Sequence, residues 1–340
     1  MSTEAIAPYA RPHVGRSLLD LATSVLPYIA LTAAGYLLLD VSVWAALAIA
    51  PLAAGFLLRT YIMFHDCAHG SFLPTKRGNV WLGRALGFVV WTPYAKWKHD
   101  HAVHHATSGD LDRRGTGDVT TWTVAEYRSK PRKSRIGYRL FRNPLVMFGL
   151  GPIWGLMIQP RRLGKGDRQR LKNSVHLTNA ALLVGIGALV WLVGWQEYLL
   201  VQGPPVFLAA AAGVWLFYVQ HQFEDAYWEN ADSWSYADAA LRGSSYLKLP
   251  QPLQWFSGNI GLHHVHHLSA RVPNYNLQAA HEGVDAFQQV PVLTLWDGLK
   301  SARLKLWDED AQRLVTWAEV RPDRPAPAAP VAQASGRSGA

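Results

Sequence analysis

The stretch Val43–Phe64, VWAALAIAPLAAGFLLRTYIMF, is an apolar run that leads directly into His65-Asp66-Cys67-Ala68-His69. A helix needs roughly 20 apolar residues to cross the hydrocarbon core of a bilayer, so this run predicts a transmembrane helix. His65 and His69 are four residues apart, which places both imidazoles on one face of a helical continuation of the span. Together, the two features predict a histidine-bearing site at one end of a transmembrane helix.

Three further apolar runs accompany this span, and together they predict an all-α integral membrane protein with four transmembrane helices. They extend over Leu18–Leu39, Val175–Trp195 and Val206–Gln220, the last being long enough if it is tilted or begins a few residues earlier. The four spans pair into two hairpins, with one turn at Asp40–Ser42 and a second from about Gly194 to Pro205. We expect the remaining segments to form a helical cap that carries the histidines.

The distribution of positive charge predicts the side of the membrane that this cap occupies. Neither hairpin turn contains Lys or Arg, whereas the segment from His65 to Ser174 contains twenty of the 33 Lys and Arg residues. Positive charge is retained on the cytoplasmic side of a membrane. We therefore expect the cap, its site and both termini to be cytoplasmic, at the inner membrane of a bacterium. His65 and His221, which end the two inward-running spans, should then lie at similar depth.

Two shorter apolar segments, Val80–Tyr94 and Pro144–Ile158, are interrupted by Gly and Pro and are short for a span. We expect both to lie as helices in the membrane interface, with re-entrant segments as the alternative. Residues 1–320 are expected to form one domain, and residues 321–340, rich in Pro, Ala and Ser, a disordered tail. Because Cys67 is the single cysteine, the chain can form neither an internal disulfide nor a cysteine-ligated iron–sulfur cluster.

Histidine is concentrated in three short motifs and one isolated position. The motifs are HDCAH from His65, HAVHH from His101 and HHVHH from His263, and the isolated residue is His221 in the stretch HQFED. On a helix, HxxxH and HxxHH spacings direct two or three imidazoles toward one point, and neutral imidazole is a common metal ligand. The motifs therefore predict a metal site assembled from separate parts of the chain.

Carboxylates next to these histidines favour a built metal site over a histidine-rich surface tract that binds metal adventitiously. A metal-ligating histidine normally donates its second N–H to a carboxylate, a carbonyl or water. The carboxylates in question are Asp66, Asp100, Glu224 and Asp225. Three other histidines have no histidine partner in local register and are not expected to bind metal: His13, His176 and His281.

The spacing alone does not identify the metal, because imidazole suits zinc, copper, iron and nickel alike. A structural zinc site usually has four ligands, often with thiolates, and fits poorly. Two metal ions with four or five imidazoles each fit better. The sequence has no phosphate-binding glycine loop, since Gly149-Leu150-Gly151 is followed by Pro152 with the wrong spacing. The histidine motifs are not accompanied by a recognisable catalytic nucleophile. A pair of metal ions at a membrane surface then indicates redox chemistry rather than hydrolysis.

The motifs HDCAH, HDHAVHH and HHVHH, with HQFED between the second and third, resemble those of the membrane fatty acid desaturase family. The stretches Lys98–His101 and Thr107–Asp112 resemble its bacterial acyl-lipid members of the Δ12 type, and the resemblance covers about residues 18–310. It implies a di-iron centre with nine ligands: His65, His69, His101, His104, His105, His221, His263, His266 and His267. His99 and His264 lie off the HxxHH register and are assigned supporting or surface roles. Asn259 is the candidate to hold a metal-bound water.

The resemblance implies that two ferrous ions and dioxygen convert a methylene pair of a lipid acyl chain into a cis double bond. The chain contains no fused haem domain, so an external electron donor such as ferredoxin is implied. The net charge of +9 would attract an acidic donor or contact anionic lipid headgroups, and we do not expect nucleic acid as a partner. Hydroxylation, epoxygenation and carotenoid ketolation on the same scaffold remain alternatives, as does a non-enzymatic membrane metal or haem protein.

Overall fold

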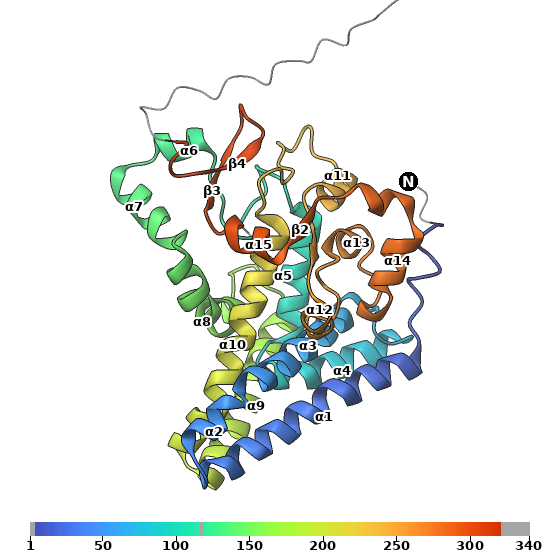
Figure 1. Ribbon diagram of the computed structural model, residues 1–340, viewed down its shortest axis with the longest axis vertical. Coiled ribbons are helices and arrows are strands. Elements are labelled where there is room, and N and C mark those ends of the chain that lie inside the picture. The colour runs from blue at the N-terminus through green and yellow to red at the C-terminus, as the bar shows by residue number, and fades with distance from the viewer. Residues whose placement is uncertain (1–3, 116–117, 321–340) are drawn as a thin grey trace, which may run out of the picture.

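The computed structural model describes residues 4–115 and 118–320. Long helices form a bundle at one end of the molecule, and shorter helices with two small sheets form a cap at the other (Figure 1). The expected all-α membrane architecture is confirmed. The predicted disordered tail, residues 321–340, lies outside the described residues.

Four stretches of helix are long and apolar enough to cross a membrane, as the sequence predicts. α1 (Val14–Leu39) and α9 (Gln169–Val193) bury only 17% and 11% of their apolar windows, so most of their apolar surface is left to face lipid. The span formed by α2 (Val43–Ala48) and α3 (Ala50–His69) is 56% buried and is the central one. α10 (Trp195–His221) completes the set.

The span predicted from Val43 is interrupted at Ile49, where α2 ends and α3 begins. Pro51 explains this break, because proline lacks an N–H donor and its ring clashes with the carbonyl four residues earlier. Proline is tolerated in the first turn of a new helix, and it lies in the first turn of α3.

The second hairpin turn lies at the start of the predicted range, Gly194–Pro205, and the rest of that range is helical. Gly194 alone separates α9 from α10, with φ of 96°, a conformation that favours glycine. Pro204 and Pro205 lie inside α10, which extends over 27 residues. Polar residues such as Glu197 lower the hydropathy of this stretch but do not disfavour a helix. Hydropathy therefore identified the apolar part of α10, from Val206, and missed its first residues.

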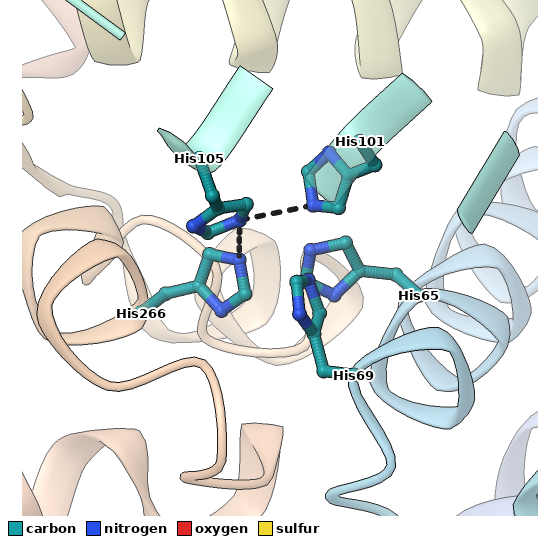
Figure 2. A group of neighbouring side chains, drawn as sticks. All are labelled: His65, His69, His101, His105 and His266. Atoms are coloured by element: carbon teal, nitrogen blue, oxygen red, sulfur yellow. Dashed lines mark hydrogen bonds between the residues drawn. The ribbon is translucent and has the colours of Figure 1, made fainter. Parts of the chain in front are cut away.

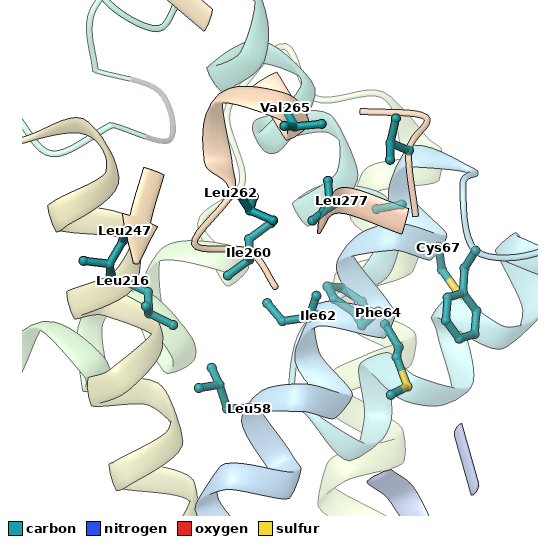
Figure 3. Close-up of a cluster of buried hydrophobic side chains, with 14 of the residues drawn as sticks. Leu58, Ile62, Phe64, Cys67, Leu216, Leu247, Ile260, Leu262, Val265 and Leu277 are labelled. Atoms are coloured by element: carbon teal, nitrogen blue, oxygen red, sulfur yellow. The ribbon is translucent and has the colours of Figure 1, made fainter. Parts of the chain in front are cut away.

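α3 packs against α1, α4 and α10 and carries the main apolar core. Figure 3 shows Leu58 and Ile62 of α3 facing Leu216 of α10. Ile260 and Leu262, from the loop between residues 256 and 263, close over them. All five side chains are buried. This apolar layer lies immediately before the last turn of α3, so it fixes the helix that presents the first histidine motif.

A buried ion pair joins Asp20 in α1 to Arg59 in α3. Arg59 also donates to the carbonyl oxygen of Trp255, and its guanidinium lies 4.1 Å from the centre of the Trp255 ring. Charged residues inside a membrane bundle are normally paired in this way. The pair therefore joins two spans to the cap.

The cap is built around α4 (Lys76–Val89) and α5 (Tyr94–Thr107), so the predicted segment Val80–Tyr94 covers most of α4 and the loop to α5. The predicted segment Pro144–Ile158 is helical, and two π-helical turns flank α8 (Gly151–Ile153) within it. Leu150, Trp154 and Ile158 are exposed there. Their exposure fits a position in the membrane interface, which remains a prediction.

The rest of the cap consists of short elements. The remaining α-helices are α6 (Val124–Ser129), α7 (Arg132–Phe141), α11 (Tyr236–Leu241), α12 (Gln251–Phe256), α13 (His263–Leu268), α14 (Leu277–Gly283) and α15 (Leu295–Ser301). Single 3-10 turns lie at Gln159–Arg161, Asn274–Asn276 and Asp285–Gln289. β1 (Tyr246–Lys248) pairs in parallel with β2 (Val292–Thr294), and β3 (Leu304–Asp308) pairs antiparallel with β4 (Arg313–Thr316).

Gly83 gives a test of the packing between α4 and α5. A Cβ atom at this position would overlap Cε2 of Tyr94, whose hydroxyl donates to the carbonyl of Cys67 at 2.8 Å. We expect Gly83→Ala to lower stability by about 1–3 kcal/mol through overpacking. Gly137→Ala in α7 is the matched control, because a Cβ added there meets no atom within 4 Å and alanine favours a helix. Thermal unfolding in detergent measures both, and equal midpoints would contradict the packing argument.

Candidate metal centre

All nine histidines that the sequence singled out lie together, in two adjacent groups. Within each group, one ring nitrogen from every residue lies within 4.8 Å of the others. The first group, drawn in Figure 2, consists of His65, His69, His101, His105 and His266. The second group consists of His104, His221, His263 and His267. The two groups thus match the expectation of two sites with four or five imidazoles each.

Helical geometry divides the two HxxHH motifs between the groups. Residues four apart are rotated by only about 40° around a helix, whereas the histidine three residues after the first is displaced by about 60° the other way. In α5, His101 and His105 therefore join the first group and His104 the second. In α13 the division is reversed, with His263 and His267 in the second group and His266 in the first.

The histidines of the two spans are placed by where those spans end. α3 stops at Gly70, whose φ of 73° closes the helix immediately after His69, so His65 and His69 occupy its last turns. α10 stops at His221, its last residue. Two spans that run in the same direction thus bring their last histidines into one centre, as the topology predicted.

The contacts between ring nitrogens fit metal ligation better than hydrogen bonding. Nε2 of His105 lies 3.1 Å from Nε2 of His101 and 2.9 Å from Nε2 of His266 (Figure 2). An imidazole nitrogen carries either one hydrogen or one lone pair, so a single nitrogen cannot form good hydrogen bonds with both neighbours. Lone pairs that converge on a shared ion explain such an arrangement.

Several ring nitrogens inside the centre have no hydrogen-bond partner among the described residues. They include Nε2 of His69, His104 and His267. A buried polar atom left unsatisfied is costly and uncommon, so each such atom in a native protein needs an explanation. One bound cation in each group would satisfy all three nitrogens, because His69 belongs to the first group and His104 and His267 to the second. The donor set therefore fits a pair of metal ions.

Burial lowers the pKa of the cap histidines in the centre well below their ordinary 6.5, and repulsion from neighbouring histidines lowers it further. This holds for His101, His105, His263, His266 and His267. Desolvation disfavours the charged imidazolium. The rings are therefore neutral at physiological pH, which is the form that binds metal.

The predicted supporting residues divide into one that contacts a histidine of the centre and four that do not. Oδ1 of Asp66 lies 3.2 Å from Nδ1 of His65. Asp100 instead accepts from Nζ of Lys96 at 2.6 Å, although it precedes His101 in the sequence. On a helix, adjacent residues point in directions about 100° apart, so sequence adjacency does not imply contact.

Glu224 and Asp225 are exposed beyond the end of α10, and Glu224 pairs with Arg313 at 3.0 Å. Nδ2 of Asn259 donates to the carbonyl of Asn274 at 3.2 Å. Asn274 is buried and donates from its backbone and side chain to Asp66, at 2.7 and 3.1 Å. No hydrogen bond joins Glu224, Asp225 or Asn259 to a histidine of the centre among the described residues, so these three assignments find no support in the structure.

Three contacts of the histidines were not predicted from the sequence. Oδ1 of Asp118 lies 2.6 Å from Nδ1 of His104, and the carbonyl oxygen of Gly243 lies 2.9 Å from Nδ1 of His221. The Trp97 ring stacks on His101 at 4.4 Å between centres. Only Trp97 carried a local signal, because it is four residues before His101 on the same helix. Asp118 and Gly243 lie in loops, and the spacing of residues in the sequence does not predict the path of a loop.

The remaining histidines lie outside both groups. His13 caps α1, and His99 and His176 are exposed. His264 is fully buried, with Nε2 3.1 Å from Nδ1 of His281, and burial lowers the pKa of His264 to about 3. None of these five residues belongs to either group.

A small, partly open cavity with room for about one water molecule borders the second group. Asp118, Phe217 and His221 are among the residues that line it, together with Ser108 and Tyr227. The Phe217 ring centre is 5.0 Å from that of His104. The cavity therefore lies beside the second group, which contributes His221 to its lining.

The low pKa values make the metal-free protein sensitive to acid. Below about pH 6.5 the unfolded chain protonates these histidines while the folded state keeps them neutral, so the unfolded state binds more protons and stability falls as the pH is lowered. Each such histidine contributes a slope of about 1.4 kcal/mol per pH unit. The pH dependence of stability is measured from the thermal unfolding midpoint of chelator-treated protein between about pH 7.5 and pH 5.5. A midpoint that stays constant or rises toward acid would contradict the burial of neutral imidazoles.

Comparison with known proteins agrees with this centre. A sequence model described as fatty acid desaturase matches residues 42–297. The chain is 47% identical over 319 residues to the fatty acid desaturase of Bacillus subtilis, covering 94% of this chain and 91% of that protein. It is 26% identical over 275 residues to the sn-1 oleoyl-lipid 12-desaturase of Synechocystis, with 76% and 74% covered. An sn-1 acyl-lipid omega-3 desaturase (ferredoxin) of Synechocystis is 26% identical over 242 residues, with 66% and 63% covered. The chain therefore belongs to the fatty acid desaturase family and is a membrane-bound oxidoreductase.

Proposed function

We propose that this desaturase uses dioxygen and two iron ions to introduce a cis double bond into an acyl chain of a membrane lipid, at a Δ12-type position. The observation that carries the proposal is the pair of histidine groups, most of whose imidazoles are buried, assembled beside the ends of two spans. The match to the family identifies redox chemistry, which zinc cannot perform. Iron is thus the metal that fits both the donor set and the reaction class.

The residues of the two groups would hold one ion each. His65, His69, His101, His105 and His266 supply five nitrogens to one ion, and His104, His221, His263 and His267 supply four to the other. When bound, the iron pair supplies the reductive activation of dioxygen needed to attack an unactivated C–H bond. The overall reaction removes two hydrogen atoms from adjacent carbons, consumes two electrons and two protons, and reduces one dioxygen to two waters.

The protein's own contribution is to exclude water and to place the acyl chain. Trp97 covers His101 and Phe217 covers His104, so apolar rings bound both groups. The centre lies where α3 and α10 end, within reach of a lipid whose acyl chain is in the adjacent bilayer layer. A substrate held in the membrane therefore needs no transfer through water to reach the site.

The position of the new double bond and the electron source are proposed from the named relatives. One relative is named as acting on oleoyl lipid at position 12, and chloroplast relatives are named omega-6 desaturases, which supports Δ12-type desaturation. Another is named as ferredoxin-dependent. We propose a ferredoxin-like protein as the external donor, because the single buried cysteine cannot ligate a cluster.

We further propose that the cap faces the cytoplasm of a bacterium. Val41, in the first hairpin turn, is 77% exposed, and Lys165, before α9, is also exposed. Val41→Cys should react with a membrane-impermeant thiol reagent in intact spheroplasts, and Lys165→Cys only after permeabilisation. The unsubstituted chain is the control, because Cys67 is fully buried and should not react. The reverse labelling pattern would place the cap outside.

The reaction is tested by expressing the full chain in a host whose lipids contain only saturated and monounsaturated acyl chains. We expect new diunsaturated chains and about two irons per purified chain, two being the number of histidine groups. His104→Ala and His266→Ala, one from each group, should abolish the new product and lower the iron content. His99→Ala, an exposed histidine of the same helix as His104, is the matched control and should retain both.

Hydroxylated, epoxidised or keto products without new double bonds would instead assign a sister reaction. Bound haem in place of iron would contradict the two-iron proposal. A double bond at a position other than the twelfth carbon would leave desaturation intact and correct only its regiochemistry.

A further inference from the structure

The second histidine group differs from the first in how its ligand candidates are supported. Nδ1 of His104 faces the carboxylate of Asp118 at 2.6 Å, whereas the contact between His65 and Asp66 is longer, at 3.2 Å. The His104 side chain is completely buried and the Asp118 side chain nearly so. A carboxylate at Nδ1 accepts its hydrogen and so leaves the lone pair on Nε2. Nε2 of His104 is the atom that belongs to the second group and has no hydrogen-bond partner among the described residues.

The loop that carries Asp118 is held from behind by a buried arginine. Nη1 of Arg142 donates to the carbonyl of Thr120 and to Oγ1 of Thr121, both at 3.2 Å. Thr121 Oγ1 in turn donates to the carbonyl of Val119 at 3.0 Å. The residues that follow Asp118 toward Trp122 are thereby tied to a single guanidinium.

The same guanidinium also reaches the end of α10. Nη2 of Arg142 donates to Oε1 of Gln222 at 2.8 Å, to the carbonyl of Leu304 at 3.0 Å and to the Tyr218 hydroxyl at 3.4 Å. Gln222 directly follows His221, the α10 member of the second group. Arg142 therefore joins the loop behind His104 to the helix end that carries His221.

Arg142 is an unusual residue to find in this place. It is fully buried, and among the described residues it has no carboxylate partner, its charge being met by neutral oxygens alone. Burying a cation without a counter-ion costs several kcal/mol by general estimates. An uncharged side chain could fill this space without that cost. The presence of a guanidinium therefore indicates that holding five separate acceptors in position outweighs the free-energy cost of burying the charge.

We propose that Asp118 and Arg142 are positioning residues for the second metal ion: Asp118 sets the tautomer and orientation of His104, and Arg142 holds Asp118 and His221 in register. This inference rests on the two-metal assignment proposed above. Loss of either residue should weaken the second metal site and leave the first intact, since neither residue contacts a histidine of the first group in the described part of the chain. Outer-shell partners of metal ligands contribute about 10–100-fold to affinity.

The test is a titration of the chelator-stripped, full-length protein in detergent with Co²⁺ alone, followed by its visible absorption. The wild type should show two binding steps. Asp118→Ala should weaken one step by about 10–100-fold and leave the other within about twofold. Asp118→Asn, which keeps an acceptor oxygen, should restore part of the loss. Arg142→Met should weaken the same step, and the intact first step reports that each variant is folded.

A double variant separates positioning from general stability. If Asp118 acts through His104, His104→Ala and the double variant His104→Ala/Asp118→Ala should bind Co²⁺ equally, because the supported ligand is already gone. Asp112→Ala is the matched control. Asp112 is an exposed aspartate a few residues before Asp118, and its side chain accepts a hydrogen bond from the backbone N–H of Ala231. Both of its binding steps should match the wild type.

Two results would overturn the inference: equal weakening of both steps by Asp118→Ala, or a double variant that binds more weakly than His104→Ala. Failure of the wild type to bind two Co²⁺ ions would have a different meaning. It would overturn the two-metal assignment itself, so the failure of that assignment is distinguishable from the failure of the positioning role.

Discussion

The packing of nine imidazoles into one small volume, with seven of them buried, is the constraint on which the rest of the structure depends. Each ring carries polar nitrogens that lose water on burial, and several of them find no protein partner among the described residues. Such an arrangement is unfavourable for a metal-free chain, because unsatisfied buried polar atoms cost free energy and charged rings would repel one another. The protein must therefore hold the rings in place with contacts made elsewhere.

Those contacts come mainly from the apolar layer below the centre. α3 is the most buried span, and its core residues pack against α10 and the loop that precedes α13. All four segments that carry histidines contribute to this one hydrophobic cluster, and Tyr94 is the buried contribution of α5. The ion pair between Asp20 and Arg59 adds a polar tie between α1, α3 and the cap. The bundle thus serves both as membrane anchor and as the rigid base of a metal site.

The centre is asymmetric although its ligand candidates come from similar motifs. An aromatic wall formed by Trp97 lies against the first group. The second group is bordered by a cavity and is supported by polar contacts from Asp118 and the Gly243 carbonyl. Hydrogen bonds to a ligand change its basicity. Those of the second group, at 2.6 and 2.9 Å, are shorter than the 3.2 Å contact between Asp66 and His65 in the first group. Two ions in such surroundings need not be equivalent in affinity or redox behaviour.

The sequence by itself determined the four spans, the two hairpins and the nine histidines, since hydropathy and the i,i+4 spacing are local properties. It placed the second hairpin turn too broadly, because polar residues such as Glu197 lower hydropathy without ending a helix. Only the tertiary structure decided how the histidines divide into groups of five and four, and that Asp118 supports His104 while Asp100 turns to Lys96. The physical reason is that a helix fixes the direction of its own side chains, whereas the partner met in that direction is set by loops and packing between distant segments.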